Sequence, residues 1–218
     1  QEIYNLAGYT SGIGMNLSPA EYSELNAMSV IRILDSVNRI NKDIKFLQAS
    51  SREIFGNPSE SPQHEETLRN PRSIYGASKL YADNIVKIYR ENMKLFACSA
   101  ILYNHESPRR KSEFIIQKII KGAVRIKKGL DSKLEIGNLD ATRDWGNAKE
   151  FVNAMYLILQ NKNAEDYIIA TGISFTVRDI CEIVFNYLDL NYEDFTKTNS
   201  INFRENETVP LVGNIEKI

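Results

Sequence analysis

Cysteine, proline and histidine are scarce in this chain of 218 residues, which contains two, six and two of them. Cys98 stands in an apolar run and Cys181 in an amphipathic one, so both are typical of buried core thiols in a reducing compartment. A disulfide framework is therefore not expected. With so few cysteines and histidines, the sequence offers no metal-binding spacing, and we expect no metal.

The sequence also lacks a surplus of charge of either sign, because 27 Lys and Arg residues face 28 Asp and Glu residues. This balance gives no general attraction to nucleic acid or to an anionic membrane, so we expect neither partner, and any anion site must be local. We find no secretory leader and no apolar run of about 18 residues. The composition is that of a soluble globular protein, for which a cytoplasmic location is the default expectation.

Strands and helices are predicted to alternate along the chain, which favours a parallel, doubly wound α/β sheet. The expected strands are residues 2–6, 45–49, 95–102, 134–136 and 167–170. The expected helices are residues 19–40, 74–89, 114–128, 146–160 and 176–188. For the second helix, Ser73 is the expected N-cap. Its expected buried stripe is Ala77, Leu80, Tyr81, Ile85, Ile88 and Tyr89.

The segments between and after these elements are predicted to be irregular. Residues 56–72 hold three of the six prolines among polar neighbours, so they predict a loop over the site. Residues 189–218 are polar and are expected to be irregular as well.

Two polar motifs flank the proline-containing loop. Ser50-Ser51-Arg52-Glu53 follows an apolar strand, and Tyr75-Gly76-Ala77-Ser78-Lys79 opens a helix 22 residues after Glu53. Tyr75 and Lys79 share a helix face because they are four residues apart. A Lys ammonium beside a phenol lowers a pKa that starts near about 10, so Tyr75 could take a proton from a substrate hydroxyl. By itself, a Tyr and a Lys four residues apart occur more often by chance. The Ser50-Ser51-Arg52-Glu53 motif at the strand end is what favours hydride-transfer chemistry.

Several segments together resemble the GDP-mannose 4,6-dehydratases, a family of extended short-chain dehydrogenases/reductases. They are residues 49–56, 71–82, 103–110, 137–146 and 168–172, of which Asn-His-Glu-Ser-Pro-Arg-Arg at 104–110 is the most specific. The resemblance runs from Glu2 to about Ile218. It implies an incomplete Rossmann-like sheet with a smaller C-terminal substrate lobe.

The resemblance also implies where the two parts divide. Residues 1–106 would form a partial dinucleotide-binding domain. Residues 107–218 would form mostly the lobe, with 147–170 returning to the sheet.

In this family, the Gly-rich turn that holds the cofactor pyrophosphate lies upstream of the segment that Glu2 matches. We therefore expect this chain to lack at least the first βαβ portion of the fold. The stretch from Gly8 to Gly14 has the Gly-x-x-x-Gly-x-Gly form, but only 61 residues separate Gly14 from Tyr75. That distance is too short for the several βα units that normally intervene.

The resemblance implies a role for each member of the two motifs. Tyr75 would deprotonate the sugar C4 hydroxyl while hydride passes to NADP, and Lys79 would hold the ribose. Glu53 would remove the C5 proton as water leaves C6, and Ser51 would hydrogen-bond the substrate at C4. Arg52 stands where the family has a small Ser, and we expect this bulky cation to weaken Glu53 as a base.

Further residues match binding positions of the family. For the cofactor these are Leu6, Ala7, Gly8, Tyr9, Thr10, Tyr22, His105 and Arg110. Arg110 suits the 2′-phosphate of NADP because its fork of donors matches a phosphate. For the nucleotide sugar the matches are Asn104, Asn138, Arg143, Arg204 and Glu207. Two alternatives stay open: Tyr22 could be an ordinary helix-surface residue, and Arg143 could form a surface ion pair with Asp144.

The expected activity is the conversion of GDP-mannose to GDP-4-keto-6-deoxymannose by internal hydride transfer through NADP. One alternative is another nucleotide-sugar dehydratase or epimerase of the same fold. Enzymes that act on deoxythymidine-diphosphate-glucose typically have an Asp-Glu pair at this strand end. The Ser-Arg-Glu sequence here therefore argues against that class. A second alternative is a non-catalytic, truncated homologue, which Arg52 and the absent Gly-rich turn favour. Members of this family commonly form dimers or tetramers, so a homo-oligomer is expected.

Overall fold

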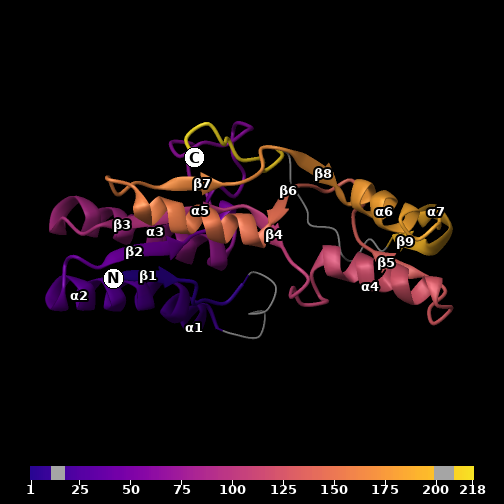
Figure 1. Ribbon diagram of the computed structural model, residues 1–218, viewed down its shortest axis with the longest axis horizontal. Helices are drawn as coiled ribbons and strands as arrows, with labels where there is room; N and C mark the ends of the chain where they lie inside the picture. Colours follow the sequence, from indigo (N-terminus) through magenta and orange to yellow (C-terminus); the bar gives the residue numbers. More distant parts are fainter. Residues whose placement is uncertain (11–17, 199–208) are drawn as a thin grey trace.

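Four parallel strands form the main sheet of the protein, in the order β1-β2-β3-β7. We describe a computed structural model covering residues 1–10, 18–198 and 209–218 (Figure 1). The strands are β1 (Glu2–Asn5), β2 (Lys45–Ala49), β3 (Ala97–Leu102) and β7 (Tyr167–Ile169). Every residue of β3 is buried, as its apolar run predicts. The parallel α/β sheet confirms the predicted fold class.

Helices cover both faces of this sheet, and the alternation of strand side chains decides which helix each residue meets. Phe46 and Ala97 pack with one long helix and with α3 (Ile74–Met93). The long helix comprises α1 (Pro19–Ser23), a π-helical segment η1 (Glu24–Met28) and α2 (Ser29–Ile40). The neighbouring residues Leu47 and Cys98 pack on the opposite face with α5 (Ala148–Gln160).

The chain after β3 builds a second, smaller core away from the main sheet. Its cluster contains Ile119, Ile136, Cys181 and Phe185, and its elements lie at the right-hand end of Figure 1. These elements are α4 (Ile115–Lys127), β5 (Leu134–Ile136), α6 (Val177–Asn186), α7 (Tyr192–Phe195) and β9 (Thr196–Thr198). This separate cluster supports the division near residue 106, which we retain as a proposal, with α5 and β7 contributing to the main sheet.

A three-stranded sheet connects the two cores. Its order is β4-β6-β8, with β4 (Asn104–Glu106) parallel and β8 (Ser174–Thr176) antiparallel to β6 (Thr142–Asn147). The helix expected from Gly146 therefore begins at Ala148, because Gly146 belongs to β6 and the Asn147 side chain caps the helix. Residues 189–218, expected to be irregular, contain α7 and β9.

The buried face of α3 differs from the one that its apolar residues predict. Tyr81 and Ile88 are exposed, as is Ala77, whereas the buried set is partly polar. The buried residues of α3 are Gly76, Ser78, Lys79, Ala82, Asp83 and Val86. Ser73 caps the helix as predicted, accepting a hydrogen bond from the Gly76 N–H. The reason for the rotated face lies in the site, because α3 turns its reactive side chains toward the sheet edge.

Both cysteines are fully buried and unpaired, as the sequence predicts for core thiols. Within the described ranges, no helix combines the length and the apolar character that crossing a membrane requires.

Candidate active site

A cleft of about 1060 Å³ lies where the main sheet meets the smaller lobe. The segments that follow β1, β2 and β3 all contribute to its wall, because the carboxyl ends of parallel strands share one edge. The cleft thereby brings together most of the site residues predicted from the sequence. They are Leu6, Gly8, Tyr9, Thr10, Ser51, Glu53, Tyr75, Lys79, Asn104, His105, Arg110, Asn138 and Arg143.

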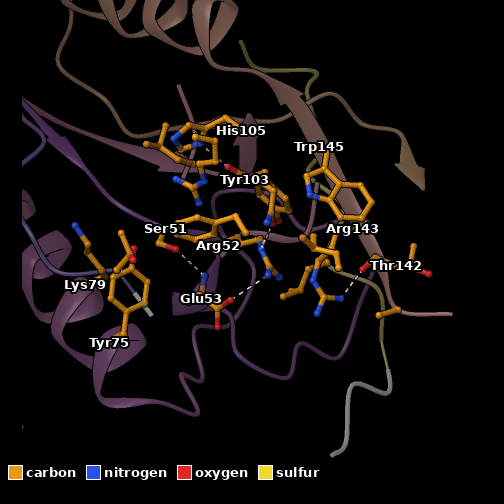
Figure 2. A pocket seen from close by; sticks show the side chains of 18 of the residues that line it. Ser51, Arg52, Glu53, Tyr75, Lys79, Tyr103, His105, Thr142, Arg143 and Trp145 are labelled. Carbon is orange, nitrogen blue, oxygen red and sulfur yellow. Dashed lines mark hydrogen bonds and ion pairs between the residues drawn. The ribbon is translucent and has the colours of Figure 1, made fainter. Parts of the chain in front are cut away.

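The end of β2 turns directly into a short 3-10 helix, η2 (Arg52–Ile54), which presents Glu53 to the cleft. The Ser51 hydroxyl caps this turn by accepting a hydrogen bond of 3.3 Å from the Glu53 N–H. Helix α3 approaches the turn closely at Gly76, where a Cβ atom would lie 2.5 Å from the Glu53 carbonyl oxygen. The glycine therefore allows Tyr75 and Glu53 to face the same space, as Figure 2 shows.

Tyr75 and Lys79 lie together at this wall of the cleft. The Lys79 Nζ donates a hydrogen bond of 2.8 Å to the Ala49 carbonyl and lies 5.8 Å from the centre of the Tyr75 ring. Burial lowers the pKa of Lys79 to about 8. The pKa of Tyr75 is raised, mainly by burial, although a hydrogen bond with Ser51 opposes this shift. The lowered Tyr75 pKa expected from the sequence is therefore wrong for this structure, because burial outweighs the nearby cations.

Arg52 is buried, although a residue at a strand end could equally have pointed into solvent. Its Nε donates a hydrogen bond of 2.8 Å to the Asn104 Oδ1. Its Nη2 lies 3.0 Å from the Glu53 Oε1, as the dashed line between them in Figure 2 marks. The guanidinium therefore connects the carboxylate expected to act as a base with an amide expected to bind the nucleotide sugar. This arrangement places Arg52 within the site rather than beside it.

The loop after β1 is held against α3 by two residues of the long helix. Asn26, in η1, accepts a hydrogen bond of 2.8 Å from the Tyr9 N–H and donates one of 3.1 Å to the Tyr9 carbonyl. Tyr22 is buried behind the loop, donates its hydroxyl to the Thr10 carbonyl and packs edge-on against Tyr75, with ring centres 6.3 Å apart. Tyr22 is therefore not a helix-surface residue.

Asn26 was not predicted from the sequence. The sequence feature that could have identified it is a polar residue on the side of the long helix that faces the core, because a buried polar side chain needs a hydrogen-bond partner. Ala7, predicted to contact the cofactor, is exposed in the same loop, and its N–H donates to the Asn5 side chain.

His105 and Arg110 enter the cleft from β4 and the segment after it. The His105 Nδ1 lies 2.9 Å from the Tyr103 carbonyl, so this nitrogen carries the proton, and the ring packs on Phe151. Burial lowers the pKa of His105, which favours the neutral ring. The Arg110 guanidinium stacks 3.5 Å above the Phe114 ring, and its Nε lies 3.6 Å from the Glu106 Oε2. Both side chains are thus held in place while they line the cleft.

Asp144 has a structural role and does not form a surface ion pair with Arg143. Its fully buried carboxylate accepts hydrogen bonds from the backbone N–H groups of Thr171, Gly172 and Gly213. The neighbouring Arg143 lines the cleft, and its Nη1 donates 2.7 Å to the Thr142 carbonyl.

Some predictions fall outside the residues that the structure describes. These are Arg204, Glu207 and most of the Gly8–Gly14 stretch, and their positions stay untested. Among the described residues, no group of three or more His, Cys, Asp or Glu side chains could hold a metal ion.

Sequence comparison relates the whole chain to one family. Residues 1–218 match the family described as GDP-mannose 4,6 dehydratase. The chain is 41% identical over 221 residues to GDP-mannose 4,6 dehydratase 1 of Arabidopsis thaliana, covering 99% of this chain and 61% of the relative. It is 45% identical over 190 residues to GDP-mannose 4,6 dehydratase of Homo sapiens, covering 86% of this chain and 51% of the relative. The chain thus spans between half and three fifths of the length of these relatives.

Solved structures of lower identity share the fold. One is RMD from Pseudomonas aeruginosa complexed with NADPH, with a TM-score of 0.90 and 24% identity over 99% of this chain and 72% of that one. Another is UDP-N-acetylglucosamine 4-epimerase from Methanobrevibacter ruminantium, with a TM-score of 0.87 and 22% identity over 100% of this chain and 68% of that one.

Proposed function

This chain belongs to the GDP-mannose 4,6-dehydratase family, and we propose that its cleft converts GDP-mannose to GDP-4-keto-6-deoxymannose. The observation that carries the proposal is the convergence of Ser51, Glu53, Tyr75 and Lys79 on one cleft. They come from two segments that no local feature of the sequence forces together. The reaction removes one water molecule and leaves the substrate without net oxidation.

The side chains of the cleft divide this chemistry between them. Tyr75, whose hydroxyl is hydrogen-bonded with Ser51, takes the proton of the sugar C4 hydroxyl when it is ionised to the phenolate. Ser51 orients the same oxygen of the sugar. Glu53 removes the C5 proton once C4 is a ketone, because a neighbouring carbonyl acidifies that C–H bond. It passes this proton to the C6 hydroxyl, which leaves as water while a C5–C6 double bond forms. Arg52 fixes the Glu53 carboxylate during these steps.

The donors around the cleft fit a nicotinamide dinucleotide, which we propose is NADP. Lys79 keeps two ammonium protons beyond the one given to Ala49, and Arg110 supplies a guanidinium suited to a phosphate. The cofactor would accept hydride from C4 and return it to C6. The residues that would hold it are Leu6, Ala7, Gly8, Tyr9, Thr10, Tyr75, Lys79, His105 and Arg110, with Tyr22 supporting the loop.

Replacing Arg110 by Ala is expected to weaken NADPH binding by roughly tenfold while changing NADH binding little, because a charge-assisted bond to the 2′-phosphate is lost. Arg109→Ala is the matched control, since Arg109 is exposed next to it. Calorimetric titration of both nucleotides measures the two affinities. Equal losses for NADPH and NADH would contradict the assignment of Arg110 to the 2′-phosphate.

The proposed function is tested with purified chain, NADP and GDP-mannose, with mass spectrometry of the sugar product. Formation of a product lighter by one water supports it. Binding of GDP-mannose without any product would instead support a non-catalytic homologue, in which the ion pair with Arg52 keeps Glu53 from acting as a base. Dehydration or epimerisation of a UDP- or dTDP-sugar in preference to GDP-mannose would favour the related enzymes. Binding of no nucleotide by folded protein would contradict both enzymatic alternatives and would favour the non-catalytic homologue.

We also propose a homo-oligomer in the cytoplasm. The exposed apolar residues Ile74, Tyr81 and Ile88 on α3 support self-association, and the two buried free thiols support a reducing compartment. Light scattering should give a molar mass of at least twice the 24.9 kDa of the chain. A monomer at micromolar concentration would contradict the oligomer.

A further inference from the structure

A buried carboxylate lies one helical turn beyond Lys79. Asp83 is 1% exposed, and its Oδ2 accepts a hydrogen bond of 2.6 Å from the Ser50 hydroxyl. Ser50 is also fixed by its backbone, since its N–H donates 2.8 Å to the Ala100 carbonyl. Asp83 therefore joins the helix that carries Tyr75 and Lys79 to the strand end that carries Ser51.

Charged groups from several elements act on Asp83 electrostatically. Lys79 lies on the same helix, Arg69 in the loop before it, and Asp166 just before β7. Asp166 is neutralised by Arg90, whose two nitrogens lie 2.7 and 2.9 Å from its oxygens. The charges around Asp83 therefore sum to a net positive charge. A negative charge on Asp83 is stabilised by this surplus and by the Ser50 hydroxyl.

Burial acts on both members of the Lys79–Asp83 pair. It raises the pKa of Asp83 to about 6, against the hydrogen bond from Ser50 and the charge of Arg69. It lowers the pKa of Lys79 to about 8, and the Asp83 carboxylate is the group that opposes this shift. Between these two values the pair is an ammonium and a carboxylate. Lys79 donates to Ala49 and lines the cleft in that form.

We propose that Asp83 is a positioning residue, which keeps the Lys79 ammonium charged and holds the Ser50-Ser51 strand end against α3. The effect of Asp83 on the pH dependence of kcat rests on the proposed function. Its electrostatic consequence concerns Lys79 alone and can be measured without turnover.

Asp83→Asn removes the charge and keeps the shape of the side chain. NMR of protein labelled in its lysine side chains, with Lys79 assigned through Lys79→Arg, follows the titration of this ammonium. We expect the midpoint to fall by about one pH unit or more, because an opposite charge in a low-dielectric site is lost. The alkaline limb of the kcat–pH profile should move to lower pH by the same amount, with a small change in KM. Glu91→Gln, an exposed acid on α3, is the control and should leave both unchanged.

Ser50→Ala gives a second, milder test, because it keeps Asp83 and removes its hydrogen-bond donor. The pKa of Asp83 should rise, so the acid limb of the kcat–pH profile should move to higher pH. An unchanged Lys79 midpoint in folded Asp83→Asn overturns the proposal, and so does a Ser50→Ala profile that superimposes on the parent's. Absence of turnover by the parent chain would contradict the proposed function instead, and the Lys79 titration then decides this inference by itself.

Discussion

Replacing Tyr75 by Phe is expected to lower the turnover of GDP-mannose by about 10² to 10⁴-fold, the range of a general acid–base group. The phenol is the group placed to take the C4 hydroxyl proton, and a benzene ring offers no substitute. The fold should persist, because Phe keeps the edge-on contact with Tyr22 and the position beside Lys79. Steady-state kcat by mass spectrometry of the product, together with thermal unfolding, measures both effects.

The matched control is Tyr81→Phe, which removes the hydroxyl of an exposed tyrosine on the same helix. Its kcat should equal that of the parent. The raised pKa of Tyr75 adds a second expectation, because a base must lose its proton before it can act. Above the acid limb that Asp83 sets, the parent rate should therefore keep rising with pH until Lys79 begins to lose its charge. A Tyr75→Phe enzyme with at least a tenth of the parent kcat would contradict the assigned role.

The arrangement of the site could be predicted from the sequence where it depends on backbone regularity. Ser51 and Glu53 follow a strand, so both were expected at the sheet edge, and Tyr75 and Lys79 are one helical turn apart, so both were expected on one helix face. The face of α3 could not be predicted in the same way. Its apolar residues suggested a buried stripe through Tyr81 and Ile88, but the helix instead buries Lys79 and Asp83. Polar residues with partners across the sheet edge outweigh a modest apolar stripe.

The electrostatics of the site were harder to predict, because they depend on burial by distant segments. The Lys79 spacing alone predicts a lowered Tyr75 pKa, whereas the structure surrounds Tyr75 closely enough for burial to raise it. Arg52 is similar. The sequence shows a cation beside Glu53, but only the fold shows that Asn104, from the next strand region, holds its guanidinium. Contacts between remote segments are what local patterns cannot supply.

Glu53→Gln is expected to separate the two halves of the proposed reaction. The Gln side chain can still accept the contact from Arg52 through its Oε1, so the turn η2 should keep its shape. It has no basic oxygen for the C5 proton, however. Formation of the 4-keto-6-deoxy product should fall by at least about 10²-fold, whereas oxidation at C4 continues.

Two measurements distinguish these steps in Glu53→Gln. Reduction of the quenched reaction with labelled borohydride traps any 4-keto sugar that has kept its C6 oxygen, and mass spectrometry in deuterated water reports proton exchange at C5. We expect the trapped ketone without C5 exchange, whereas the control Glu66→Gln, an exposed acid of the 56–72 loop, should dehydrate normally. Equal loss of both steps would mean that Glu53 acts before C4 is oxidised. Its contact with Arg52 would then matter for binding the sugar rather than for removing its C5 proton.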